Sequence, residues 1–159
     1  MKILLSVLGI MVFSGVSMAE AKLPKSIAHL QEMATNEVEL VSATRRYHLQ
    51  QIELNDWDRE TAKNYQGDDV QSMQTILMEK IKGRSDSIKL AWDYVLSIYP
   101  NNAEATNYLG EYWYDTGGNQ AAAVTHWKRA LMLKKDFSLP HNNLGIHYFH
   151  TGDYRKGLQ

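Results

Sequence analysis

The chain has 159 residues, with 17 basic and 18 acidic side chains, 44% hydrophobic residues and 22% charged residues. This balance is typical of a folded chain and excludes extensive disorder, and the near-neutral charge gives no electrostatic reason to expect nucleic acid as a partner. Cysteine is absent, which excludes disulfides, thiolate metal sites and a lipid-modified cysteine anchor.

Residues 1–19 have the features of a secretory signal peptide. Lys2 precedes an apolar run over residues 3–16, and small residues ending at Ala19 suit cleavage there, with an alternative site two residues further on. The apolar run of fourteen residues is shorter than the roughly 20 needed to span a bilayer, so cleavage is favoured over retention as an anchor helix. We therefore expect a periplasmic or secreted protein with no stable membrane span after cleavage.

Residues 22–66 are expected to form an N-terminal helical extension. Ser26 can cap a helix, and apolar side chains then recur every three or four residues, as on one face of an amphipathic helix. A break is expected at residues 55–58, followed by a brief helix over residues 59–66. The apolar positions of this face are Ile27, Leu30, Ala34, Val38, Val41, His48, Leu49 and Ile52.

A further amphipathic helix is expected over residues 70–81. The preceding Gly-Asp-Asp sequence at residues 67–69 supplies a stop and then an N-cap. Gly83 is expected to end this helix. Its apolar positions are Val70, Met73, Leu77 and Ile81.

The second half of the chain repeats itself at a shift of thirty-five positions. Residues of like kind align at packing positions in two successive helices, and a common shift of this kind is typical of a repeat architecture. The first set of aligned pairs is Ile88 with Ala123, Trp92 with Trp127, Val95 with Ala130, Leu96 with Leu131 and Ile98 with Leu133. The second set is Leu109 with Leu144, Gly110 with Gly145, Trp113 with Tyr148, Tyr114 with Phe149, Thr116 with Thr151 and Gly117 with Gly152.

Glycine and proline positions indicate how the repeated helices are connected. Gly110 has no side chain and permits close approach of a neighbouring helix. The glycines at 117–118 and at 152 suit short turns between helices because glycine accepts positive φ angles. Pro100 is expected to close the helix before it. A later helix is expected to begin near Gln120 and to end around residues 134–135, where lysines suit the negative end of the helix dipole.

The repeated positions resemble the tetratricopeptide repeat, whose period is about 34 residues. The resemblance covers residues 86–159 and implies an all-α fold, in which antiparallel helix hairpins stack as a short α-solenoid preceded by amphipathic helices. The repeats would span residues 70–102 in divergent form, 103–137, and 138–159 incompletely. The matching positions are Leu109, Gly110, Trp113, Gly117, Ala123, Trp127 and Ala130 in one copy, and Leu144, Gly145, Tyr148, Thr151, Gly152, Asp153 and Tyr154 in the next.

The copies depart from the family pattern at three places. There is one extra residue in the turn at 117–119, Lys135 replaces the usual closing proline, and Gly157 replaces a small alanine. The sequence also stops inside the second helix of its last copy, whereas a solenoid normally finishes with a polar capping helix. We therefore expect a longer product. Otherwise the last pair should fray, with fast amide exchange from Leu139 to Gln159, or should self-associate through its uncapped face.

The sequence gives little support for a catalytic or metal site. His147 and His150 are one helical turn apart and His141 is near, but no acidic residue or cysteine completes a ligand set within that helix. Common catalytic and phosphate-binding motifs are absent, and the paired acidic residues at 56–58 and 68–69 are explained by helix caps. We therefore expect no enzymatic activity, no cofactor and no metal.

The resemblance does imply a partner-binding surface. In tetratricopeptide proteins the first helices of successive pairs line a concave groove. The chaperone-binding members carry lysine and arginine there to clamp a terminal carboxylate, and this chain has none. The corresponding surface is instead acidic and aromatic, which favours a basic protein or peptide. The positions are Glu104, Asn107, Tyr108, Glu111, Tyr114, Asp115, Asn142, Asn143, Ile146, Phe149 and His150.

The leading functional hypothesis is an exported interaction module or scaffold that binds a partner segment in this groove. One alternative is an envelope structural protein that self-associates through the helices of residues 26–82. Another is the N-terminal adaptor of a longer enzyme.

Overall fold

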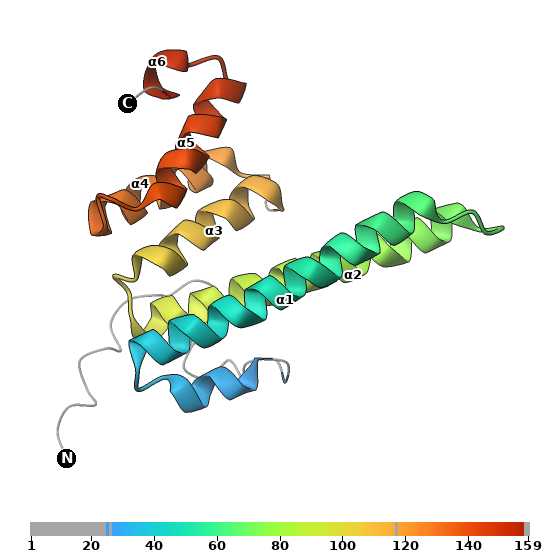
Figure 1. Cartoon of the computed structure of the whole chain (residues 1–159), viewed down its shortest axis with the longest axis horizontal. Helices are drawn as coiled ribbons and strands as arrows, with labels where there is room; N and C mark the ends of the chain where they lie inside the picture. The colour runs from blue at the N-terminus through green and yellow to red at the C-terminus, as the bar shows by residue number, and fades with distance from the viewer. Residues whose placement is uncertain (1–24, 26, 117, 158–159) are drawn as a thin grey trace, which may run out of the picture.

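The computed structural model describes residue 25, residues 27–116 and residues 118–157 (Figure 1). The expected signal peptide at residues 1–19 therefore lies outside the described residues. The described part of the chain is helical without strands, as predicted, and none of its helices is both long and apolar enough to cross a bilayer. The elements are the 3₁₀ helix η1 (Ala28–Met33) and the α-helices α1 (Glu37–Asn64), α2 (Val70–Ile98), α3 (Ala103–Asp115), α4 (Gln120–Leu133), α5 (Ser138–His150) and α6 (Tyr154–Gly157).

The single amphipathic helix expected to start at Ser26 is replaced by two elements, η1 and α1. Asn36 caps α1 by accepting a hydrogen bond from the backbone N–H of Glu39 at 3.2 Å. Because α1 starts afresh at Glu37, its residues do not continue the apolar face of the expected helix. Val38, which the expected apolar face included, is 74% exposed. Ile27 and Leu30 of the same expected face are fully buried. The prediction of one continuous face was wrong because a strong capping residue interrupts it.

The break expected at residues 55–58 is also absent, since α1 continues to Asn64. Asn55 and Asp58 are buried rather than exposed in a loop, and both accept hydrogen bonds from Arg84 of α2. The Nη1 atom of Arg84 lies 2.5 Å from Oδ2 of Asp58 and 3.2 Å from Oδ1 of Asn55. A polar pair that bridges two helices thus looks like a helix break when one helix is considered alone.

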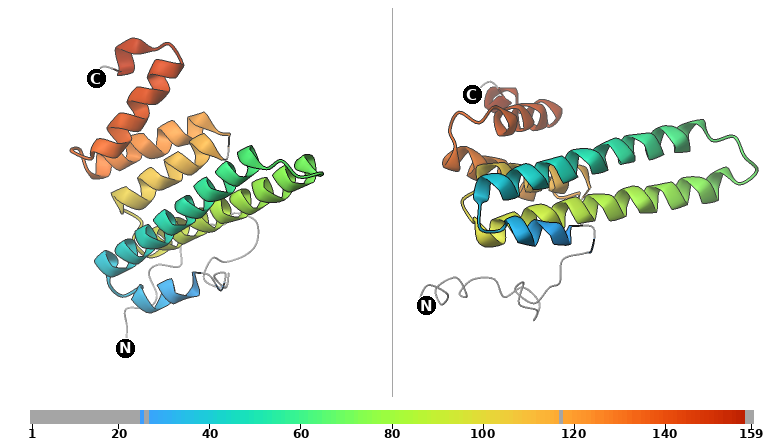
Figure 2. Two further views of the ribbon diagram at one scale, coloured as in Figure 1. Left: turned by 45° about the vertical axis from the view of Figure 1, so that its right-hand side comes forward. Right: turned by 60° about the horizontal axis from the view of Figure 1, so that its bottom comes forward.

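Gly83 does not end a helix. It lies inside α2, which runs for 29 residues and starts at Asp69, the expected cap, whose side chain accepts from the N–H of Ser72 at 3.0 Å. The helix pair expected within residues 70–102 is therefore not formed. Instead α2 lies beside α1 over its length, and the two extend together away from the other helices (Figures 1 and 2).

Helix α4 (Gln120–Leu133) lies close to the bounds expected for it. Helix α2 ends just before Pro100, and α3, α4 and α5 follow in order. Gly118 and Gly152 adopt φ angles of 60° and 76°, which explains glycine in both turns. A Cβ at Gly110 would lie 2.5 Å from Nε1 of Trp127, so α3 and α4 approach each other closely at this glycine, as predicted.

Two apolar clusters hold the helices together in the described part of the chain. One joins η1, α1, α2 and α3 around Trp92, which is 0% exposed, and the other joins α3, α4 and α5 around Trp127, which is 2% exposed. Helix α3 belongs to both clusters. It therefore connects the long α1–α2 pair to the C-terminal helices, as Figure 2 shows.

Candidate functional site

The predicted surface begins near the N-terminus of α3 with Glu104. This carboxylate forms a two-pronged ion pair with Arg45 of α1, and both N···O distances are 2.5 Å. The hydrogen bond with Glu104 raises the pKa of Arg45. A bidentate pair of this kind fixes the geometry of both groups. Arg45 therefore neutralises the charge of Glu104, and the pair links α1 to α3.

Tyr108 lies one turn further along α3 and packs at the meeting point of three helices. Its ring stacks on Trp92 of α2 with centroids 4.6 Å apart, and it meets the ring of His48 of α1 edge-on at 4.7 Å. The indole N–H of Trp92 donates to Nδ1 of His48 at 3.3 Å. Burial lowers the pKa of His48 to about 4, although Glu104 acts in the opposite direction. Tyr108 is therefore mainly a packing residue.

Asn107 and Glu111 form a polar network with Asn143 of α5. The Nδ2 atoms of Asn107 and Asn143 donate to Oε1 of Glu111 at 2.8 and 3.1 Å, and Asn143 also donates to Oδ1 of Asn107 at 3.3 Å. Asn107 is 0% exposed, so its side chain cannot touch a partner. Burial raises the pKa of Glu111, whereas the hydrogen bonds from Asn143 and Asn107 lower it. The negative charge of Asp115 raises it further.

Asp115 lies at the end of α3, with Tyr114 before it. Burial raises the pKa of Asp115, and Arg59 of α1 opposes the rise from a distance. Arg59 itself forms an ion pair with Asp56 at 2.7 Å. Within residues 27–116 and 118–157, no basic side chain lies within 4.0 Å of the carboxylates of Glu111 or Asp115.

Tyr114 belongs to an aromatic group at the α3, α4 and α5 contact. Its ring centroid is 5.4 Å from that of Trp127 and 6.0 Å from that of His147. His147 Nδ1 and Trp127 Nε1 are buried without a hydrogen-bond partner. The three rings pack against one another where α3, α4 and α5 meet.

The α5 members of the predicted surface other than Asn143 are exposed. Ile146 is 48% exposed and Phe149 is 65% exposed. They line a wide, open hollow on the outer side of α5, next to α6. The residues that line it are Ser138, His141, Asn142, Gly145, Ile146, Phe149, His150 and Gly157.

The predicted surface thus divides into two parts. Glu104, Asn107 and Tyr108 of α3 are engaged with other helices, and Asn143 of α5 is engaged with α3. Glu111 is partly exposed, and Asp115 and the other α5 residues are accessible. The sequence analysis missed Arg45 and His48, which contact the predicted residues directly. They lie outside the repeat, and no spacing in the sequence relates them to α3.

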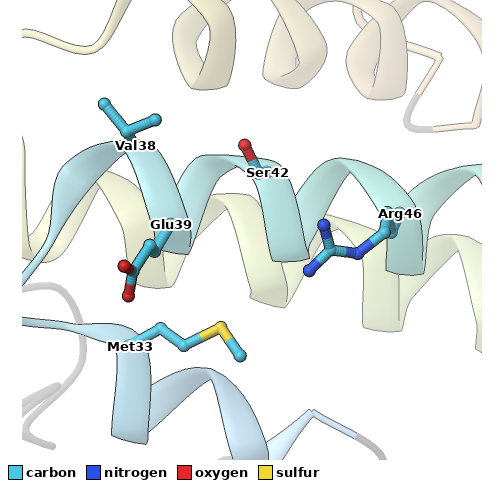
Figure 3. Close-up of a pocket in the computed structure, with 5 residues that line it drawn as sticks. All are labelled: Met33, Val38, Glu39, Ser42 and Arg46. Atoms are coloured by element: carbon cyan, nitrogen blue, oxygen red, sulfur yellow. The ribbon is translucent and has the colours of Figure 1, made fainter.

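A second, smaller hollow lies between η1 and the first turns of α1 (Figure 3). Met33 of η1 forms one side, and the charged side chains of Glu39 and Arg46 lie along α1 on the other. All of its α1 residues except Ser42 are exposed. Among the described residues, no three histidine, cysteine or acidic side chains gather in a way that could hold a metal ion.

Comparisons of the chain with protein-family models, with curated proteins and with solved structures found no significant match.

Proposed function

We propose that the chain is an exported protein-interaction module of the tetratricopeptide type, in which successive helix pairs stack and their first helices present a groove to a partner polypeptide. The pairs would be α1 with α2, α3 with α4, and α5 with α6. The proposal is supported by the order of helix contacts along the chain and by the equivalent burial of Trp92 and Trp127 on the second helices. It replaces the pair expected within residues 70–102 by the longer α1–α2 pair.

We propose that the partner segment is basic and is held at Glu111 and Asp115. The observation that carries this proposal is that both carboxylates have a raised pKa from burial and neither has a basic side chain within ion-pair distance among the described residues. A lysine or arginine of the partner would compensate this desolvation and the repulsion between the two acids. Tyr114 is half-buried beside them and offers apolar contact.

Export is part of the same proposal, because it depends on the signal peptide expected at residues 1–19. A mature protein that begins at Glu20 or Lys22 in the envelope or the medium would support it. N-terminal sequencing of the protein from its native host measures this directly. A protein that keeps residues 1–19 and remains in the cytoplasm would contradict it.

Peptide binding tests the groove. Fluorescence anisotropy would compare labelled twelve-residue peptides rich in lysine or rich in glutamate, at low and high salt. Asp115→Asn should weaken binding of the basic peptide roughly tenfold, since a pair to a partly desolvated charge contributes about 1.4 kcal/mol or more. Asp136→Asn is the matched control, because Asp136 is an exposed acid after α4. Equal binding of both peptides, or equal effects of both variants, would show the groove assignment to be wrong.

A further inference from the structure

The carboxylate of Glu111 has one occupied oxygen and one open oxygen. Its Oε1 atom accepts two amide hydrogen bonds, from Nδ2 of Asn107 at 2.8 Å and from Nδ2 of Asn143 at 3.1 Å. A carboxylate oxygen has two lone pairs, so two donors use its capacity. Oε1 is therefore closed to a donor from a partner.

The other oxygen, Oε2, accepts no hydrogen bond from the residues that the structure describes. It is not enclosed either, because the buried polar side-chain atoms without a partner in this part of the chain are Nδ2 of Asn55, Nε1 of Trp127 and Nδ1 of His147. Asp115 follows four positions later on α3 and is exposed, so its carboxylate lies one turn away on the same side of the helix.

The orientation of Glu111 is set from within the fold. Nδ2 of Asn143 also donates to Oδ1 of Asn107 at 3.3 Å, so the two amides that hold Oε1 are joined to each other. Asn107 is 0% exposed, and a partner cannot displace it without opening the helix contact. The single open oxygen is therefore a fixed feature of this surface.

Glu104 on the same helix shows the contrasting arrangement. Both of its oxygens are taken by the guanidinium of Arg45, with N···O distances of 2.5 Å. Two-pronged pairing of this kind is what distinguishes arginine from lysine at a carboxylate. An arginine cannot pair with Glu111 in this way, because one of the two oxygens is already occupied.

We propose that the basic residue held at Glu111 and Asp115 is a lysine rather than an arginine, and that its ammonium group bridges Oε2 of Glu111 and the carboxylate of Asp115. The inference rests on the function proposed above and specifies the partner of the same groove. An ammonium group is compact and has three donors, so it can serve two separate acceptors. An arginine that forks onto Asp115 leaves Glu111 uncompensated. Asn143 is then a positioning residue, since it closes Oε1 and leaves Oε2 for the partner.

Two peptides of equal length and equal charge test this choice. Fluorescence anisotropy would compare the lysine-rich twelve-residue peptide with the same sequence in which every lysine is replaced by arginine. The general attraction between opposite charges acts on both peptides, so a difference in affinity reports the geometry of the site. We expect the lysine peptide to bind at least about fivefold more tightly.

The result separates the two proposals. Equal affinities, or a preference for arginine, in binding that Asp115→Asn weakens would overturn the lysine assignment and leave the proposed function standing. If neither peptide binds, the proposed function is wrong and the lysine assignment is wrong with it. The comparison uses the original chain, so it holds even where a variant fails to fold.

Asn143→Leu tests the positioning role. It removes one donor from Oε1 with little change in volume, so an arginine gains access to both oxygens of Glu111, and the preference for lysine should fall at least about threefold. Asn64→Leu is the matched control, because Asn64 donates to Glu60 at 2.7 Å on an exposed part of α1. It should leave the preference unchanged. Equal effects of the two variants would overturn the role of Asn143, and circular dichroism would check that both keep their helices.

Titration of the Glu111 carboxyl carbon by NMR gives a readout that needs no peptide. Burial raises the pKa of Glu111, whereas the hydrogen bonds from Asn143 and Asn107 lower it. Asn143→Leu should therefore raise the midpoint of this titration, and Asn64→Leu should not. The resonance of Asp115 would be followed as well, because its charge acts on Glu111. An unchanged midpoint in Asn143→Leu would show that the amide does not hold Oε1 and would overturn the proposal.

Discussion

His48 makes the stability of this chain sensitive to acid in a way that one substitution can isolate. Its Nδ1 atom accepts the indole N–H of Trp92 at 3.3 Å, and its ring packs on Tyr108. This arrangement requires a neutral imidazole, because a protonated Nδ1 would meet the N–H of Trp92 with a second donor. Burial lowers the pKa of His48 from 6.5 to about 4.

The direction of the effect follows from linkage. A lowered pKa in the folded state means that the unfolded chain binds the proton more readily, so stability is full above pH 6.5 and is lost as the pH falls towards 4. For a shift from 6.5 to about 4, the free energy of unfolding should fall by about 2 kcal/mol between pH 7 and pH 5. Glu111 and Asp115 act in the opposite sense, because burial raises the pKa of both carboxyl groups.

The contribution of His48 is therefore obtained as a difference. Urea denaturation followed by circular dichroism at pH 7, 6 and 5 would compare the chain with His48→Gln, which can still accept the hydrogen bond but does not titrate. The original chain should lose about 2 kcal/mol more than the variant over this range. Equal losses would refute the reasoning that the fold requires neutral His48.

Three further substitutions test the packing. Arg84→Ala should lower the free energy of unfolding by about 3 to 5 kcal/mol, because it leaves the buried Asp58 carboxylate without its partner. Adding Asp58→Leu to this variant should restore much of the lost stability. Thermal denaturation measures both effects. Gly110→Ala should destabilise by about 1 to 3 kcal/mol, since the new Cβ would press on Trp127. Gly83→Ala, where a Cβ meets nothing within 4 Å, should stabilise by roughly 0.5 to 1 kcal/mol. Effects of the same sign at the two glycines would contradict the structure.

The parts of the fold that the sequence predicted are those specified by local signals. The turns at Gly118 and Gly152 need positive φ angles, and the close approach at Gly110 needs a residue without a side chain. These requirements are met within a few residues of the chain, and the thirty-five-residue shift repeats them. The turns that follow α3 and α5, and the bounds of α4, could therefore be predicted.

The errors concern residues whose partners are far away in the sequence. Asn55 and Asp58 look like a loop until Arg84 is known to lie against them. Gly83 looks like a helix end until α1 is known to pack along α2 and to stabilise a helix that propensity alone would interrupt. Tertiary contacts outweighed local preference at both places.

The candidate site shows the same division. The spacing of the repeat placed Glu104, Tyr108 and Glu111 along one helix. It gave no indication that Arg45 neutralises Glu104. Nor could it show that Tyr108 packs between His48 and Trp92. The α1 residues lie outside the repeat, so their contribution appears only in three dimensions.

The claim that a groove along α3 receives a basic segment is tested most directly by NMR titration of the isotopically labelled chain with a lysine-rich peptide. The proposal predicts that the largest amide shifts cluster around Glu111, Tyr114 and Asp115, and that Asp115→Asn reduces them. Shifts centred instead on the hollow between η1 and α1, around Met33 and Arg46, or no saturable shifts at all, would contradict it.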